Sequence, residues 1–257
     1  MILTISPGNP ESKAPTMFSK GNLYLIPSPI GNAPVSKVMP AENLQLLARI
    51  SVFIVEEIKT ARRFISSIGI DLKEQPKEFL EFNEHSDNMD VTAYLQAAMN
   101  GKDIAILSEA GLPCIDDPGS LIVARAHQLG IRVIPLIGPS SIFLALMASG
   151  FNGQKFLFQG YLPIEKNDRT RFVKDMERQS RKDSVTQIFI ETPYRNNQMM
   201  EVLLKACSDF TRLCVALDLN SSDEFIQSKT IREWKFGKKF EMNKKPAVFL
   251  LYAGDEI

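Results

Sequence analysis

Histidine, cysteine and long apolar segments are scarce in this sequence, and each shortage disfavours a class of function. The chain of 257 residues has two histidines and three cysteines, Cys114, Cys207 and Cys214, which lack the spacing of metal ligands. A zinc site and a Ser-His-Asp triad are therefore disfavoured, and no metal is expected. The odd number and wide separation of the cysteines are typical of a reducing compartment, so we expect a cytoplasmic protein. No apolar run approaches the roughly 20 residues of a membrane-spanning helix, and we expect no membrane contact.

Net charge is also absent, but the charges are unevenly distributed along the chain. Acidic residues outnumber basic residues over 71–120, whereas basic residues dominate 166–182 and 229–245. These segments are either solvated faces of helices and loops, or the basic ones form a surface in the C-terminal half for an anionic substrate.

The order of the predicted elements indicates an α/β protein with two domains. Short apolar strands alternate with amphipathic helices in the first half, which is typical of a largely parallel sheet covered by helices. We predict a first α/β domain over residues 21–138. Residues 139–257 are predicted to form a second α/β domain around a mixed sheet, to which SKTIREWKF (228–236) contributes. Residues 1–20 lack the regions of a signal peptide and are predicted to be a flexible lead-in.

Loops follow five of the predicted strands at positions where a ligand could bind, and three of these loops are rich in glycine and proline. SEAGLPCIDDPG (108–119) is the most pronounced, with two glycines, two prolines and three carboxylates. Glycine leaves space where a ligand approaches the main chain, and proline holds a turn rigid. Because ligands collect at the carboxyl ends of strands in open α/β sheets, these loops predict a ligand cleft. The other four are PSPIGN (27–32), EEIKT (56–60), NEHSDN (83–88) and LIGPSS (136–141).

The predicted cleft lacks the motifs of common nucleotide sites. The sequence contains no GxGxxG after its first strand and no GxxxxGK[ST], which disfavours a dinucleotide site and a P-loop. Acidic loops suit a cationic ligand better than a phosphate. A sulfonium cofactor such as S-adenosylmethionine has that charge.

Several segments occur together in a familiar order from about residue 20 onward: LYLIPSPIGN, VFIVEE, Asn83-Glu84, DIAILSEAGLPCIDDPG, IRVIPLIGPSS and IETPYR. This set resembles the S-adenosylmethionine-dependent tetrapyrrole methylase superfamily, and within it the branch of 16S ribosomal RNA cytidine 2′-O-methyltransferases. The resemblance implies two α/β domains with S-adenosylmethionine in the cleft between them. It also implies a homodimer, with which the apolar segment SIFLALMASGF is compatible.

The resemblance further assigns cofactor contacts to this chain. They come from the first loop, the loop over 108–119, the start of the helix after LIGPSS and the ends of three strands in the second domain. The residues are Ile30, Ala110, Gly111, Leu112, Ile115, Ser140, Ser141, Glu191, Val215, Pro246 and Ala247.

The acceptor side of the predicted site lies at the end of the second strand. A ribose hydroxyl is a weak nucleophile, so a nearby base helps methyl transfer. Glu56, Glu57 and Lys59 are the candidate catalytic residues, with Glu109 as a further candidate base. The alternatives are an ion pair of Glu56 with a nearby arginine and an exposed position for Lys59 at the start of a helix.

Three further residues are candidates to bind the acceptor. Asn32 and Asn83 have the amide groups to orient a hydroxyl, and Arg195 has a guanidinium that binds phosphate. Alternatively, Arg195 pairs locally with Glu191. Ribosomal RNA is the partner that the resemblance implies.

One departure from the branch keeps other functions open. The branch usually carries E-D-T-R after the second strand, whereas this chain has Glu56-Glu57-Ile58-Lys59. The loss of arginine removes a planar fork that binds phosphate in bidentate fashion. One alternative is therefore a methylase of a small anionic acceptor such as a tetrapyrrole, which the basic segments would also suit. The other is a cofactor-binding paralogue without turnover.

Overall fold

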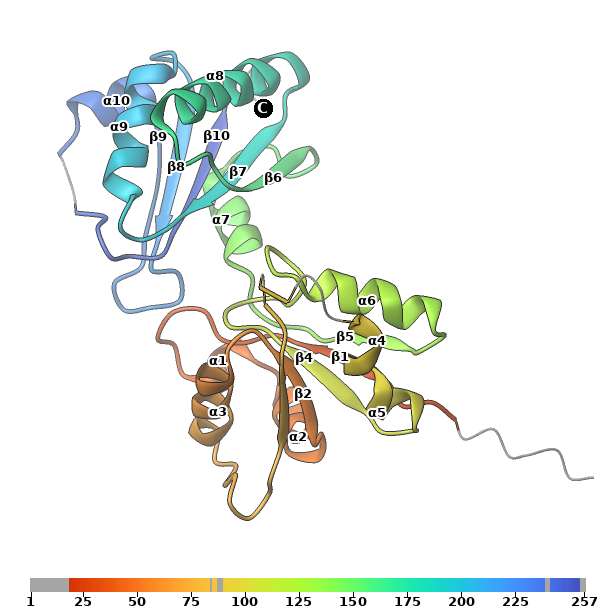
Figure 1. Cartoon of the computed structure of the whole chain (residues 1–257). Coiled ribbons are helices and arrows are strands. Elements are labelled where there is room, and N and C mark those ends of the chain that lie inside the picture. Colours follow the sequence, from red (N-terminus) through yellow and green to blue (C-terminus); the bar gives the residue numbers. More distant parts are fainter. Residues whose placement is uncertain (1–18, 84, 87–89, 239–240, 255–257) are drawn as a thin grey trace, which may run out of the picture.

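The computed structural model describes residues 19–83, 85–86, 90–238 and 241–254. These residues form two five-stranded sheets, one in each half of the chain (Figure 1). Most of the predicted lead-in over 1–20 lies outside the described residues, and so does Glu84. The predicted α/β class, with a parallel and a mixed sheet, is confirmed.

The first sheet is entirely parallel and has the order β3-β2-β4-β1-β5. Its short strands are rich in β-branched and other apolar residues, which favour a pleated, buried surface. The strands are β1 (Leu23–Ile26), β2 (Val52–Val55), β3 (Glu78–Glu81), β4 (Ile104–Leu107) and β5 (Val133–Pro135).

Helices cover both faces of this sheet, so its central strands are buried on both sides. Alternate residues of β2 show this: Phe53 packs in the cluster that contains α2 and α3 side chains, and Ile54 packs in the cluster that contains α5 and α6 side chains. The helices of this half are α1 (Val35–Val38), α2 (Ala41–Arg49), α3 (Ile58–Ser67), α4 (Val91–Tyr94), α5 (Gln96–Met99) and α6 (Gly119–Gln128).

The second sheet is mixed and has the order β6-β7-β10-β8-β9. The pair β6–β7 is parallel, and the other neighbours are antiparallel. The strands are β6 (Phe156–Tyr161), β7 (Thr186–Glu191), β8 (Arg212–Leu217), β9 (Phe225–Thr230) and β10 (Ala247–Tyr252).

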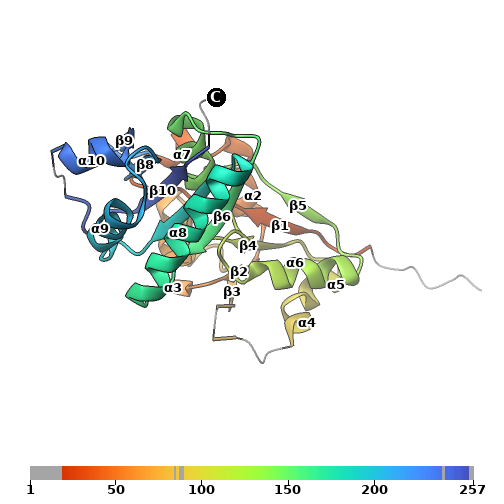
Figure 2. The same cartoon turned by 90° about the horizontal axis from the view of Figure 1, so that it is seen from above.

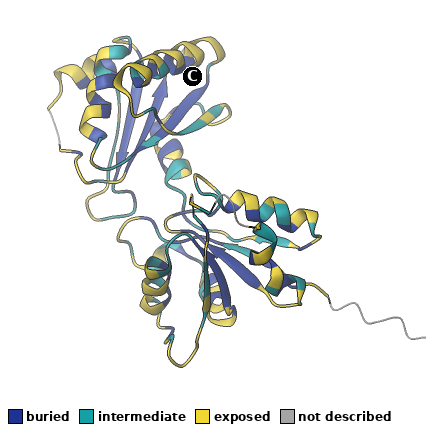
Figure 3. Cartoon of the chain, viewed as in Figure 1, coloured by how far each residue is buried: buried dark blue, intermediate teal, exposed yellow. Residues whose placement is uncertain are grey.

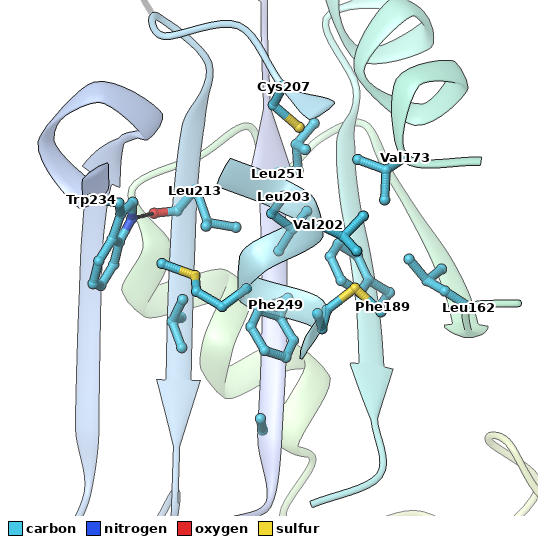
Figure 4. Packing of buried hydrophobic residues seen from close by; sticks show 14 of the residues in the cluster. Leu162, Val173, Phe189, Val202, Leu203, Cys207, Leu213, Trp234, Phe249 and Leu251 are labelled. Carbon is cyan, nitrogen blue, oxygen red and sulfur yellow. Dashed lines mark hydrogen bonds between the residues drawn. The ribbon is translucent and has the colours of Figure 1, made fainter. Parts of the chain in front are cut away.

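Different helices cover the two faces of the second sheet. Side chains of α8 (Lys166–Asp183), α9 (Asn196–Ala206) and α10 (Ile231–Phe236) build the core on the outer face. Figure 4 shows this core, in which Trp234 donates a hydrogen bond from Nε1 to the carbonyl of Leu213, 2.9 Å away. The helix α7 (Ser141–Ser149) packs on the inner face and connects the two halves in Figure 1.

The segment 228–236 departs from its prediction as part of the second sheet. Only its first three residues belong to β9, and the rest form α10. Thr230 and Glu233 form a reciprocal capping box that starts the helix. The edge of the sheet is therefore shorter than predicted and ends at a helix cap.

The two halves meet near the loops that follow the strands of the first sheet. Ile30, from the loop after β1, packs in the core cluster of the second sheet beside Leu219. The buried residues are concentrated in the strands of both sheets (Figure 3). Seen from above, α4, α5 and α6 of the first half extend beyond the second half (Figure 2). The predicted boundary between residues 138 and 139 stays a prediction. In the described part of the chain, no helix combines the length and apolarity needed to cross a membrane.

Candidate functional site

A cavity of about 420 Å³ lies between the loops of the first sheet and the strand ends of the second. Its volume is in the range of small-molecule sites. The first half contributes residues from the loops after β1, β2 and β4, and the second half contributes the start of α7 and strand ends of the sheet. Of the predicted site residues, those that line it are Ile30, Glu56, Ala110, Gly111, Leu112, Ile115, Ser140, Ser141, Glu191, Pro246 and Ala247.

The loop over 108–119 is held by its own backbone. Gly111 exchanges two backbone hydrogen bonds with Ser28, at 2.9 and 3.0 Å, and accepts a further bond of 2.9 Å from the Ser108 hydroxyl. Gly111 has a φ of 77°, in the left-handed region that glycine adopts without strain. These bonds fix one edge of the loop and leave the other facing the cavity.

Asp117 stabilises the turn that leads into α6. Its carboxylate accepts hydrogen bonds from the backbone N–H groups of Cys114 and Gly119, each 2.7 Å long. Of the two neighbouring aspartates, Asp117 is therefore the one that binds the loop backbone. The Asp116 carboxylate lies instead against β6, because a Cβ added to Gly160 would be 3.1 Å from Asp116 Oδ1.

Of the three candidate catalytic residues, only Glu56 lines the cavity, and the further candidate base Glu109 lines it as well. Burial raises the pKa of Glu56 to about 7, and the negative charges of Asp117, Glu109 and Asp116 add to the shift. A carboxylate with this pKa exchanges a proton near neutral pH, which is the property of a general base. The predicted alternative, an ion pair of Glu56 with an arginine, is not found among the described residues, where Arg62 lies over the ring of Phe79 instead.

Glu57 has a different task from the predicted one. Both of its oxygens accept hydrogen bonds at the start of α3, from the backbone N–H groups of Lys59 and Thr60 and from the Thr60 hydroxyl. The Thr60 hydroxyl lowers the pKa of Glu57. A helix cap of low basicity is a poor proton acceptor, so the structure revises Glu57 from base to cap. Lys59 does not line the cavity. It is exposed at the start of α3, which is the alternative to a catalytic role.

The three predicted acceptor contacts lie outside the cavity lining. Asn32 is exposed, next to lining residue Gly31. Asn83 closes a turn by accepting from the backbone N–H of His85, 3.0 Å away. Arg195 forms an ion pair with Glu191 at 2.6 Å, which is the local alternative to phosphate binding.

Val215 does not face the cavity, which corrects its predicted cofactor contact. It is fully buried in the core beneath α9, whereas the next residue, Ala216, lines the cavity. Successive side chains of a strand point to opposite faces, so a placement one residue off selects the wrong face. Ala216 is therefore the β8 residue at the site.

Substitution of Ala216 should change cofactor affinity, whereas substitution of Val215 should change stability. Ala216→Leu adds a branched side chain to the cavity wall, and cofactor affinity should fall by roughly tenfold to hundredfold. Val215→Ala should lower the free energy of unfolding by about 2 kcal/mol and leave affinity unchanged. Calorimetric titration and chemical denaturation measure the two quantities. Weaker binding in Val215→Ala without a change in Ala216→Leu would contradict this assignment of faces.

Glu191 has an unused oxygen at the cavity. Its Oε1 accepts bonds from Arg195 Nε, 2.8 Å away, and from the backbone N–H of Thr192, 2.7 Å away. Its Oε2 is buried and has no hydrogen-bond partner among the described residues. A buried acceptor of this kind requires a donor. The amino group of an adenine is such a donor, so this wall fits the adenosine of S-adenosylmethionine.

The charge of the cavity also fits that cofactor. Asp218 pairs with Lys245 at 3.1 Å, so this carboxylate is neutralised as Glu191 is. Among the described residues, no ion pair neutralises the other lining carboxylates. A sulfonium and an ammonium group are favoured in such surroundings. These unpaired residues are Glu56, Glu109, Asp116 and Asp117.

Several lining residues had no signal in the sequence. Phe158 and Ile190 add an apolar wall from β6 and β7, and Tyr161 lies at the end of β6. The glycine and proline loops of the first half drew attention to one side of the site only. Aromatic and aliphatic residues in strands are indistinguishable from core residues until the sheet faces are known.

Comparisons with known proteins give consistent relatives. No family model matches the chain. It is 31% identical over 189 residues to ribosomal RNA small subunit methyltransferase I of Thermotoga maritima, covering 74% of this chain and 79% of that protein. It is 29% identical to the protein of the same name from Vibrio cholerae, over 82% of this chain and 69% of the relative. The relative of that name from Escherichia coli O157:H7 is 27% identical over 91% and 77%, respectively.

Two solved structures share the fold at low sequence identity. The methyltransferase CobJ superposes with a TM-score of 0.59 at 15% identity, covering 90% of this chain and 94% of CobJ. Uroporphyrin-III-C-methyltransferase from Thermus thermophilus superposes with a TM-score of 0.52 at 16% identity, over 91% and 92%. The predicted two-domain tetrapyrrole methylase architecture is thereby confirmed.

Proposed function

The chain belongs to the ribosomal RNA small subunit methyltransferase I family, and we propose that it methylates the 2′-hydroxyl of a cytidine in 16S ribosomal RNA. It is an S-adenosylmethionine-dependent methyltransferase. A cavity that joins an apolar adenosine wall to the carboxyl of Glu56 is the observation that carries the proposal. An RNA substrate of this kind places the protein in the cytoplasm, as its cysteine content predicts.

Residues from both halves hold the cofactor in this proposal. The backbone around Gly111 approaches it from the first half, and Ser140 and Ser141 meet its methionine part at the start of α7. Glu191 Oε2 would accept a hydrogen bond from the adenine, on the wall that Ala216 also lines. The bound cofactor supplies an electrophilic methyl group, and holding it against the acceptor oxygen is the main contribution of the protein.

Glu56 would accept the proton of the ribose hydroxyl as that oxygen takes the methyl group, while the methyl–sulfur bond breaks and S-adenosylhomocysteine leaves. Its pKa near 7 lets it hold that proton and release it to water at neutral pH. Glu109 also has a raised pKa, chiefly because of burial, and its charge near Glu56 supports the shift. The neighbouring Glu57 fixes the start of α3 and so holds the turn that carries Glu56.

A reaction with purified components tests the proposal against the small-acceptor alternative. The protein is incubated with labelled S-adenosylmethionine and either small ribosomal subunits that lack the modification or uroporphyrinogen. We expect 2′-O-methylcytidine in the nuclease digest of the 16S RNA and no label in the tetrapyrrole. Label in the tetrapyrrole alone would replace the proposed acceptor, and label in neither would favour a paralogue without turnover.

We also propose that the protein is a homodimer through α7. Phe143 and Met147 lie one helical turn apart and are 48% and 79% exposed, and the preceding Ile137 is 81% exposed. Phe143 also contacts Phe156 of β6 edge to face, with centroids 5.9 Å apart. Large apolar side chains gathered on one exposed face mark an interaction surface.

Light scattering should show twice the chain mass of 28.8 kDa at micromolar concentration. Met147→Glu should give the monomer mass, because a charge buried without a partner destabilises the interface. Phe236→Glu is the matched control, since Phe236 is 83% exposed on α10, away from α7. A monomeric wild-type protein would refute the proposal.

A further inference from the structure

A bulge in β6 turns Tyr161 toward the cavity. Phe158 pairs with Ile188 and Tyr161 pairs with Ile190, so three steps along β6 match two steps along β7. The extra residue lies next to Gly160, whose φ of 62° is in the left-handed region. A bulge with this geometry changes the face on which the following side chain lies.

Without the bulge, Tyr161 would lie on the opposite face of the sheet. Gln159, two residues earlier, donates a hydrogen bond to Gln187, which in turn donates to Gln179 of α8. In a regular strand Tyr161 would share that face beneath α8. Instead it lines the cavity with its pairing partner Ile190.

The bulge also places Tyr161 where β6 meets the loop of the first half. The site of a Cβ on Gly160 is 3.1 Å from Asp116 Oδ1, so the two segments touch there. Burial raises the pKa of Tyr161, and the carboxylates of Asp116, Glu191 and Glu56 add to the shift, whereas the guanidinium of Arg195 opposes it. Tyr161 is still 53% exposed, which places its ring at the mouth of the cavity.

The chemistry of this mouth selects the part of an RNA that enters it. The Arg195 charge is neutralised by its ion pair with Glu191. The carboxylates of Glu56 and Asp116 repel phosphate, so a neutral base and ribose are the groups that fit. Proteins bind unstacked bases on the faces of aromatic side chains, because every base has a π-face. An exposed tyrosine ring near the candidate base is such a platform.

We propose that Tyr161 is the positioning residue that stacks on the base of the acceptor nucleotide, through its ring and not through its hydroxyl group. This inference rests on the proposed function, because it requires an RNA acceptor. The stacked base anchors the nucleotide, and its ribose is then held toward Glu56. The bulge next to Gly160 orients the Tyr161 ring toward the cavity for this role.

Steady-state kinetics of Tyr161→Ala and Tyr161→Phe test this inference with small ribosomal subunits as substrate. In Tyr161→Ala, kcat/KM for the RNA should fall by roughly 5- to 150-fold, mainly through KM, while the dissociation constant of S-adenosylmethionine stays unchanged. Tyr161→Phe should restore the wild-type value, since the ring is kept. Phe210→Ala is the control, because Phe210 is 80% exposed before β8, at the strand end remote from the cavity.

Three results would overturn the inference. Wild-type kcat/KM in Tyr161→Ala would remove the stacking role. A matching loss of cofactor affinity would assign the ring to the cofactor, and a defect in Tyr161→Phe equal to that of Tyr161→Ala would assign the role to the hydroxyl. Failure of the wild-type protein to methylate any RNA would instead overturn the proposed function, on which the inference depends.

Discussion

Glutamine in place of Glu56 is expected to slow methyl transfer by roughly 10²–10⁴-fold and to leave the affinity for S-adenosylmethionine nearly unchanged. The variant keeps the size and hydrogen-bonding capacity of the side chain but removes the carboxylate that accepts the proton. Single-turnover rates with RNA, together with calorimetric titration of the cofactor, separate the two effects.

The pH dependence gives this prediction a second readout. The pKa of Glu56 is raised to about 7, so the group is protonated and inactive as a base below that pH. The wild-type rate should therefore rise through pH 7 and level off above it, while the residual rate of Glu56→Gln should lack this step. Ionising a carboxyl of raised pKa also costs stability. The contribution of Glu56 to the free energy of unfolding should therefore decrease as the pH rises from about 4.5 to about 7 and stay constant above that.

Glu57→Gln is the matched control for this experiment. The two residues are adjacent and the chemical change is identical, but Glu57 caps α3. Glutamine retains part of the cap, so transfer should stay close to wild type. If Glu57→Gln abolished transfer while Glu56→Gln retained it, the base would have been assigned to the wrong glutamate. Wild-type rates in both variants would mean that alignment alone drives transfer.

Valine in place of Gly111 is expected to abolish detectable cofactor binding. The Cβ itself has room, with Ile30 Cγ2 at 3.5 Å and the Pro139 carbonyl at 3.6 Å, but a φ of 77° is a left-handed conformation that branched residues avoid. The loop must shift or the two added methyl groups must occupy space beside the cofactor. Either outcome removes the main-chain contact with the cofactor that we propose for Gly111.

The protein should nevertheless stay folded in this variant. Strain at one residue costs about 1–3 kcal/mol, which is less than the stability of a typical domain. Gly153→Val is the control, because a Cβ at Gly153 meets nothing within 4 Å. Circular dichroism confirms folding, and calorimetry measures binding. Wild-type affinity in Gly111→Val would show that the cofactor does not touch this loop.

Elements with strong local signals were predictable from the sequence. The loop over 108–119 has its glycines, prolines and carboxylates in one short segment, and it lines the cavity as predicted. The apolar strands β2 and β4 were equally clear, because each is buried on both faces. The cap at Thr230 and Glu233 also had a signal, the T-x-x-E spacing, which should have indicated a helix over the following residues.

Other features depend on contacts that the sequence does not display. The choice between Val215 and Ala216 depends on which alternate side chains of β8 face the cavity. The pairing of β8 with its neighbours in the sheet decides this. The pairing of Arg195 with Glu191 and the cap role of Glu57 are decided by geometry at the ends of β7 and β2. The orientation of Tyr161 depends on a bulge, which one glycine in a strand does not specify.

Nucleoside mass spectrometry of 16S ribosomal RNA from a deletion strain tests the central claim most directly. Three versions of the deletion strain are compared: one without a plasmid, one with a plasmid that carries the wild-type gene, and one with a plasmid that carries the Glu56→Gln variant. We expect that a 2′-O-methylcytidine is absent after deletion, returns with the wild-type gene, and does not return with the variant. An unchanged 2′-O-methylcytidine content in the deletion strain would contradict it.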